Sequence, residues 1–162
     1  AVITDIPRLP IAILTADCAP ILIYDKQKKM IAAIHAGWKG AYKGIISKVI
    51  NFMIKKGCEK KNIVAVIGPC IAQKSYNVKE SFKTKFLKKD KRNKVFFKKR
   101  KNLIYFDLSK YVKLQLKLMK ITNLDTINID TFPKKNNFFS ARRSLNLKHD
   151  DYGRNISLIM IN

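Results

Sequence analysis

The sequence predicts a single α+β domain, residues 1–162, that contains mixed β-sheets. The chain has the length of one domain, and 47% of its residues are hydrophobic, which is enough to bury a core. Apolar runs typical of strands alternate with segments of helical periodicity. Two of these runs are joined by a short polar turn, as in a β-hairpin, so a purely parallel sheet is disfavoured.

Three apolar runs form the first elements. Strands are predicted at Ile11–Ala16, Ile21–Asp25 and Met30–His35, with a polar turn at Asp25–Lys29. Pairing across that turn between Asp25 and Met30 fixes the register. Pro20 then faces His35, and Cys18 lies one diagonal step from His35, roughly 7–8 Å between Cα atoms. That distance suits two ligands of one metal ion.

The clearest helix is Trp38–Lys56. Apolar residues recur on one of its faces at helical spacing, namely Tyr42, Ile45, Ile46, Val49 and Met53. Gly57 follows as a C-terminal stop. Ile63–Ile67 is then predicted to be a buried strand, which ends at Gly68-Pro69.

The second half of the chain combines two further helices with strands and loops. Helices are predicted at Val78–Lys89 and from Asp107, which can cap the helix, to about Lys120. Strands are predicted at Thr126–Asp130 and Ile156–Ile161. The segment Lys88–Lys101 is predicted to be a basic loop or irregular segment, and Thr131–Arg154 is predicted to be mostly loop.

Composition limits the class of protein. No apolar run reaches the roughly 18 residues of a membrane span, and the first residues lack a signal-peptide pattern, so we expect a cytoplasmic protein with no membrane partner. Three cysteines do not make a secreted disulfide framework. The net charge of +23 suggests a basic nucleic-acid-binding module. Most of the cations are Lys, and Lys, Ile and Asn share A/T-rich codons, so we favour genome composition over a nucleic-acid partner.

Two polar motifs interrupt the apolar strands. Asp17 and Cys18 stand where alternation predicts more apolar residues, and burial of an unpaired carboxylate is costly. His35 ends a strand and leads through Gly37 into a helix whose first N–H groups can bind an anion. An inert Cys and a satisfied core His are the structural alternatives. The predicted proximity of Cys18 and His35 favours a metal or nucleophile site.

Further residues are candidates for binding substrate or phosphate. At the helix start these are Gly37, Trp38 and Gly40, where small residues let a ligand approach the backbone. Arg142 and Arg143 follow two aromatic residues, a combination that suits phosphate binding and base stacking, although such pairs are often only solvated. Cys70, in a strand-to-loop turn, could equally belong to the site or to the core.

Six motifs in this order resemble the laccase-domain family, whose bacterial members are described as polyphenol oxidase or purine nucleoside phosphorylase. The motifs are Thr15–Pro20, His35–Gly40, Gly68–Ile71, Asp107-Leu108, Phe138–Arg143 and Gly153-Arg154. The resemblance implies a layered α/β/β/α-like fold with mixed β-sheets. It also implies a Zn²⁺ site, or alternatively a Cu²⁺ site, made by two His and one Cys. Cys18 and His35 match two of these three ligands.

The resemblance also implies the reaction. It implies phosphorolysis of purine nucleosides (adenosine, inosine, guanosine and methylthioadenosine) with phosphate, together with adenosine deamination. Asp17, Cys18 and His35 would be the catalytic residues, with Asp17 orienting the site or transferring a proton. The alternatives within the family are copper-dependent polyphenol oxidation and editing of peptidoglycan precursors. An inactive remnant is a further alternative.

Two positions depart from the family pattern. The third metal ligand of the family is a His in a Gln-Val-His-type motif that would lie upstream of Ala1. Asp130-Thr131 stands where the family usually has Cys-Thr. Two ligands are fewer than the three protein ligands of a typical catalytic zinc site. We therefore expect this laccase-type domain to be incomplete at its N-terminus.

Overall fold

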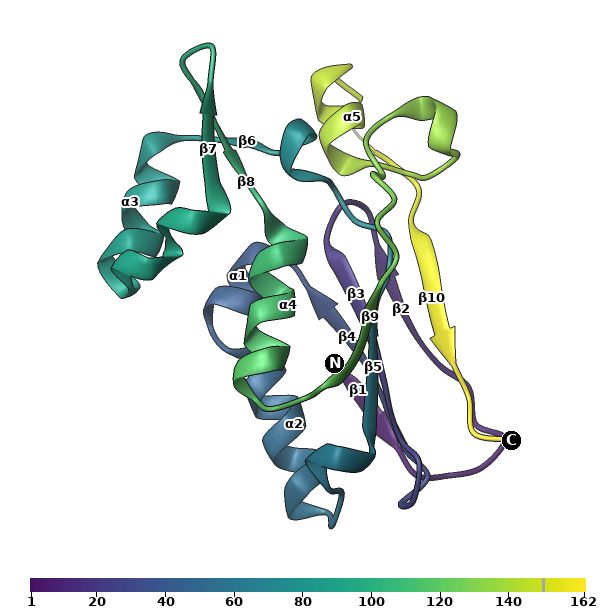
Figure 1. Ribbon diagram of the computed structural model, residues 1–162. Helices are drawn as coiled ribbons and strands as arrows, with labels where there is room; N and C mark the ends of the chain where they lie inside the picture. The colour runs from purple at the N-terminus through teal and green to yellow at the C-terminus, as the bar shows by residue number, and fades with distance from the viewer. Residues whose placement is uncertain (150) are drawn as a thin grey trace.

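A five-stranded mixed sheet forms the centre of the computed structural model, which describes residues 1–149 and 151–162 (Figure 1). The strand order is β1-β4-β3-β5-β9. These strands are β1 (Val2–Thr4), β3 (Ala19–Asp25), β4 (Met30–Ala36), β5 (Ile63–Ile67) and β9 (Asn123–Thr126). Neighbours are antiparallel except for β5 and β9, which are parallel, so the predicted mixed sheet is confirmed.

A layer lies on each face of this sheet. Three helices cover one face, α1 (Trp38–Tyr42), α2 (Ile45–Lys55) and α4 (Leu108–Leu118). The antiparallel pair β2 (Ile11–Thr15) and β10 (Asn155–Ile159) covers the other. Because β4 is covered on both sides, six of its seven residues are buried. The helix–sheet–sheet order agrees with the predicted layered α+β fold.

Most of the remaining elements lie near one end of the central sheet (Figure 1). A three-stranded sheet has the order β6-β8-β7, with β6 (Asn77–Val78), β7 (Phe97–Arg100) and β8 (Leu103–Phe106). Helix α3 (Glu80–Lys89) packs beside it, and α5 (Ala141–Asn146) lies near β10. Short 3₁₀ helices are η1 (Lys60–Asn62), η2 (Gln73–Ser75), η3 (Lys91–Phe96) and η4 (Lys134–Asn136).

The predicted hairpin register is confirmed. Asp25 pairs with Met30, and Pro20 pairs with His35. The Asp25 side chain explains the turn, because its buried carboxylate accepts hydrogen bonds from the backbone N–H groups of Gln27 (2.9 Å) and Lys28 (2.8 Å). A polar turn thus fixes which strand residues face each layer.

The predicted helix over residues 38–56 is wrong in one respect, because it is two helices. α1 ends at Tyr42, and α2 begins at Ile45 after Gly44, whose φ of +80° is left-handed. Only glycine adopts this conformation without a steric penalty. The apolar periodicity continues across the break and therefore conceals it.

Several predictions for the second half also need correction. The basic segment 88–101 is not a loop, since it contains η3 and β7, which pairs with β8. The strand predicted at 126–130 is β9 at Asn123–Thr126. The segment 131–154, of which residue 150 lies outside the described residues, is mostly loop as predicted, although it contains η4 and α5. The final strand ends at Ile159 rather than Ile161. Pairing partners distant in sequence decide these boundaries, and local pattern does not reveal them.

The outer face of the β2–β10 pair is apolar. Ile156 lies opposite Leu14, and Leu158 lies opposite Ala12. Leu14, Ile156 and Leu158 are 54%, 65% and 54% exposed. Strands that are apolar on both faces are typical of sheets covered on both sides. This outer face is therefore an exposed apolar patch.

No helix within the described part of the chain combines the length and the apolar character needed to cross a bilayer.

We expect Gly44→Ala to lower the free energy of unfolding by about 1–2 kcal/mol, because it forces a side chain into left-handed backbone. Urea denaturation followed by circular dichroism measures the change. Gly40→Ala is the matched control. Gly40 lies inside α1, and a Cβ atom placed on it would have no neighbouring atom closer than 3.6 Å. Equal stability of the Gly44→Ala variant and the wild type would contradict the strain argument.

Candidate active site

The hairpin brings Cys18 and His35 together around Gly37. A Cβ atom placed on Gly37 would lie 2.8 Å from Cys18 Sγ and 3.9 Å from His35 Nε2. The sulfur and the ring nitrogen are therefore both within 4 Å of one point. Only a residue without a side chain leaves this space open. The structure thus brings the two residues together, as the predicted register requires.

Burial sets the protonation of both groups in the protein alone. Burial, followed by the negative charge of Asp17, raises the pKa of the Cys18 thiol to about 11. Partial burial lowers the pKa of His35 below its ordinary value. A hydrogen bond with the backbone of Leu14 acts in the opposite direction but does not outweigh the burial. At neutral pH the site therefore holds a neutral thiol and a neutral imidazole. A metal that binds the sulfur must displace its proton.

A thiolate and an imidazole are donors that suit Zn²⁺ or Cu²⁺. Within residues 1–149 and 151–162, no group of three or more His, Cys, Asp or Glu side chains is placed to hold a metal ion. Cys18 and His35 therefore fit a metal as two of its ligands. A catalytic zinc site usually has three protein ligands.

Asp17 connects the site to the distant C-terminal part of the chain. Its buried carboxylate accepts hydrogen bonds from Thr131 Oγ1 (2.7 Å), Ser140 Oγ (3.0 Å) and the backbone N–H of Arg142 (2.7 Å). Its φ of +82° turns the chain sharply before Cys18. These three hydrogen bonds join Asp17, the neighbour of Cys18, to Thr131 and to the start of α5.

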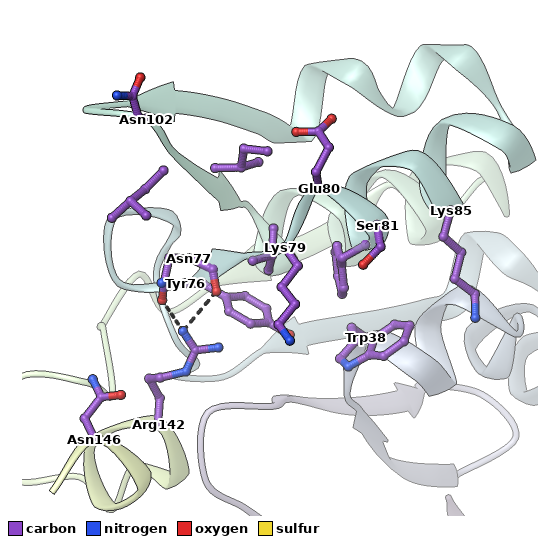
Figure 2. Close-up of a pocket in the computed structure, with 14 residues that line it drawn as sticks. Trp38, Tyr76, Asn77, Lys79, Glu80, Ser81, Lys85, Asn102, Arg142 and Asn146 are labelled. Carbon is purple, nitrogen blue, oxygen red and sulfur yellow. Dashed lines mark hydrogen bonds between the residues drawn. The ribbon is translucent and has the colours of Figure 1, made fainter.

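A cavity of about 1060 Å³ opens beside this cluster. Figure 2 shows Trp38, Tyr76, Asn77, Lys79, Lys85 and Arg142 among the side chains that line it. It combines aromatic surface with three cations. Two of its residues connect it to the cluster: Trp38 follows Gly37 in the chain, and the Arg142 N–H binds Asp17. Gly37 and Gly40 are not among the lining residues.

Arg142 is held in place at the cavity wall. Its Nη1 donates to the backbone carbonyl of Asn77 at 3.0 Å and also to the side-chain oxygen of Asn77 (Figure 2). The guanidinium group lies over the Tyr76 ring, 5.4 Å from the ring centroid. No protein partner is found for its Nε and Nη2 among the described residues. These N–H groups can bind an anion.

Arg143 has a different role from its neighbour. Its guanidinium donates to the carbonyls of Thr131 (3.1 Å), Phe132 (2.6 Å) and Phe138 (2.6 Å). It therefore holds the loop before α5, and a phosphate would have to compete with these bonds. Similarly, α1 has only five residues, so its N-terminus offers little of the dipole that a long helix would give to an anion near Gly40.

Tyr76, Asn77 and Lys79 line the cavity although the sequence does not predict them as site residues. They lie between η2 and α3, where Asn77 begins the two-residue strand β6, and no spacing signal marks them. The sequence likewise predicts no role for Asp130, whose carboxylate accepts from the backbone N–H of Ala72 (3.1 Å) and from Ser75 Oγ (2.7 Å). Asp130 thus fixes the turn that precedes Tyr76.

The other sequence-predicted residue near this turn is Cys70. It is buried, and its backbone forms an isolated parallel bridge with Asp130. Burial, with smaller contributions from nearby carboxylates, raises the pKa of its thiol to about 12. These observations favour packing over reactivity.

Known proteins match this chain over nearly its whole length. The chain is 40% identical over 156 residues to a purine nucleoside phosphorylase of Rickettsia conorii, spanning 95% of this chain and 64% of that protein. It is 36% identical over 166 residues to a purine nucleoside phosphorylase of Bacteroides thetaiotaomicron, spanning 99% of this chain and 60% of that protein. The chain thus spans slightly less than two thirds of the length of these relatives.

Solved structures share the fold. Bacillus licheniformis hypothetical protein YfiH superposes with a TM-score of 0.87 at 30% identity, covering 99% of this chain and 60% of that chain. Neisseria meningitidis protein NMB0706 superposes with a TM-score of 0.85 at 26% identity, covering 99% and 63%. The family described as "Multi-copper polyphenol oxidoreductase laccase" matches residues 1–162. The chain therefore belongs to this multi-copper polyphenol oxidoreductase laccase family.

Proposed function

We propose that the intact protein is a metal-dependent purine nucleoside phosphorylase. The observation that carries the proposal is the convergence of Cys18 Sγ and His35 Nε2 beside a cavity lined by aromatic rings and cations. Relatives named purine nucleoside phosphorylase support it. The proposed substrates are adenosine, inosine, guanosine and methylthioadenosine with phosphate, and adenosine deamination is a second proposed activity.

The cavity residues suggest how the two substrates would be held. The free N–H groups of Arg142 would bind phosphate, because a guanidinium matches the geometry of two phosphate oxygens. The faces of Trp38 and Tyr76 would contact the purine. In phosphorolysis a phosphate oxygen bonds to C1′ of the sugar while the bond from C1′ to the base breaks. Because Arg142 is held by Asn77, phosphate would be oriented at little entropic cost.

Cys18 and His35 would hold Zn²⁺, or alternatively Cu²⁺, with a His outside residues 1–162 as the third ligand. When bound, the metal polarises a substrate oxygen or activates water. Asp17 would hold Arg142 and Cys18 in their relative positions, because it precedes Cys18 in the chain and its carboxylate accepts a hydrogen bond from the Arg142 N–H.

The test is phosphate-dependent release of hypoxanthine from inosine by the intact protein and by its Cys18→Ala and His35→Ala variants. We expect both variants to lose activity by at least about 100-fold and to lose their bound metal, because either change removes a ligand. Circular dichroism checks that the variants are folded. Full activity in both variants would refute the site assignment.

A second candidate is copper-dependent oxidation of phenols, which the description of the matching family favours. The same cysteine and histidine would serve a copper ion. The two functions differ in their requirements, since phenol oxidation needs oxygen and phosphorolysis needs phosphate. Oxygen uptake with a phenol, measured on protein loaded with copper or with zinc, separates them.

A further inference from the structure

A basic unit, residues 79–101, comprises α3, η3 and β7. It contains twelve of the chain's 34 Lys and Arg residues but only two of its 11 Asp and Glu residues. The unit is about one seventh of the chain and carries more than one third of the cations. A bias in genome composition acts on the whole chain, so it does not explain this concentration.

The two carboxylates of the basic unit are already paired within it. Glu80 accepts from Lys83 at 3.1 Å, and Asp90 accepts from Arg92 at 2.7 Å. The other cations of the unit have no carboxylate within 4.0 Å among the described residues. Exposed examples are Lys88, Lys91, Lys94, Lys98, Lys99 and Arg100. Their charge is available to a ligand in solution.

An aromatic cluster joins α3 to β7 within the basic unit. Phe82 and Phe86 of α3 stack at 4.8 Å between centroids, and Phe97 of β7 packs against both at 6.2 and 5.9 Å. The β7–β8 hairpin projects from the rest of the molecule (Figure 1). The positive charges are therefore carried by packed secondary structure.

The basic unit borders the cavity of the candidate active site. Lys79 and Lys85 of the unit line the cavity, as does Asn102 in the hairpin turn (Figure 2). Trp38 and Tyr76 supply aromatic surface in the same cavity. Several exposed lysines beside aromatic rings suit a ligand with repeated phosphates and stacking bases.

We propose that the basic unit binds the phosphate backbone of single-stranded nucleic acid, with bases directed toward the aromatic cavity. This surface revises the expectation that nucleic acid is not a partner, which rested on the predominance of Lys and on genome composition. The backbone contacts proposed here do not depend on the metal site, because the hairpin cations lie outside the Cys18 and His35 cluster.

The test is fluorescence anisotropy of a labelled single-stranded RNA of about 20 nucleotides, measured with the whole chain between about 50 and 200 mM salt. Lys98→Gln, Lys99→Gln and Arg100→Gln are combined in one variant. We expect binding at about 50 mM salt to weaken at least about tenfold. The slope of log affinity against log salt should fall by about 2, because three phosphate contacts are lost.

A matched control removes the same charge elsewhere. Lys48, Lys55 and Lys60 are exposed on α2 and η1, away from the hairpin, and their Gln variant should bind RNA within about threefold of wild type. Equal weakening by both variants would mean that net charge alone acts, and would overturn the proposal. Absent RNA binding at low salt, or binding only to vesicles of anionic lipid, would overturn it too.

Discussion

Asp17→Ala is expected to lower the free energy of unfolding by about 3–5 kcal/mol. The variant removes a buried carboxylate that accepts three hydrogen bonds, and it leaves the donors on Thr131, Ser140 and Arg142 without a partner. Each buried donor without a partner costs about 1–3 kcal/mol. The φ of +82° adds strain for alanine, whereas Asp and Asn adopt left-handed backbone more readily.

Two other variants divide this effect into parts. Asp17→Asn keeps one acceptor oxygen and the tolerance for positive φ, so it should cost less than Asp17→Ala. Ser140→Ala removes one donor to Asp17. It also removes the N-terminal cap of α5, because the Ser140 hydroxyl accepts a hydrogen bond from the Arg143 N–H at 3.1 Å. It should cost about 1–2 kcal/mol. Chemical denaturation measures all three, and a loss below about 1 kcal/mol in Asp17→Ala would contradict the positioning role.

The hairpin shows what the sequence can predict. Two apolar runs flank a polar turn, and the side-chain period of two in a strand leaves one register that buries the correct face. Pro20 therefore faces His35 as predicted. By contrast, the break between α1 and α2 depends on the backbone of Gly44, which an apolar period of 3.6 does not reveal.

The candidate site likewise contains one part that the sequence predicts and another that it does not. Cys18 and His35 were predictable because one hairpin relates them. The contact of Asp17 with Arg142 joins residues 125 positions apart, and the fold of the whole chain decides it. The different roles of Arg142 and Arg143 have the same origin, since neighbouring residues on a helix point in different directions. Local sequence shows that the two Arg are present but not which of them reaches the cavity.

Gly37→Ala is expected to lower kcat/KM for inosine phosphorolysis by about 100-fold in the intact protein and to reduce its metal content. The new Cβ would lie 2.8 Å from Cys18 Sγ, a distance that real Cβ atoms do not tolerate, so the sulfur must move. His35 Nε2 lies 3.9 Å from the same point, so a shift of the sulfur changes the geometry between the two ligands. A displacement of about 1 Å in an active site can cost that much activity.

The control must lose stability without touching the ligands. Gly57→Ala meets this need, because Gly57 has a φ of +90° and its nearest neighbour is the flexible end of Lys28, at the far end of α2 from Cys18. It should lower stability by about 1–2 kcal/mol and leave zinc content and kcat/KM within about threefold of wild type. If Gly37→Ala and Gly57→Ala behave alike in both measurements, the loss reflects stability, and the space beside Gly37 is not a ligand site. If only Gly37→Ala loses metal and activity, the converging sulfur and ring nitrogen are the part of this chain on which the chemistry depends.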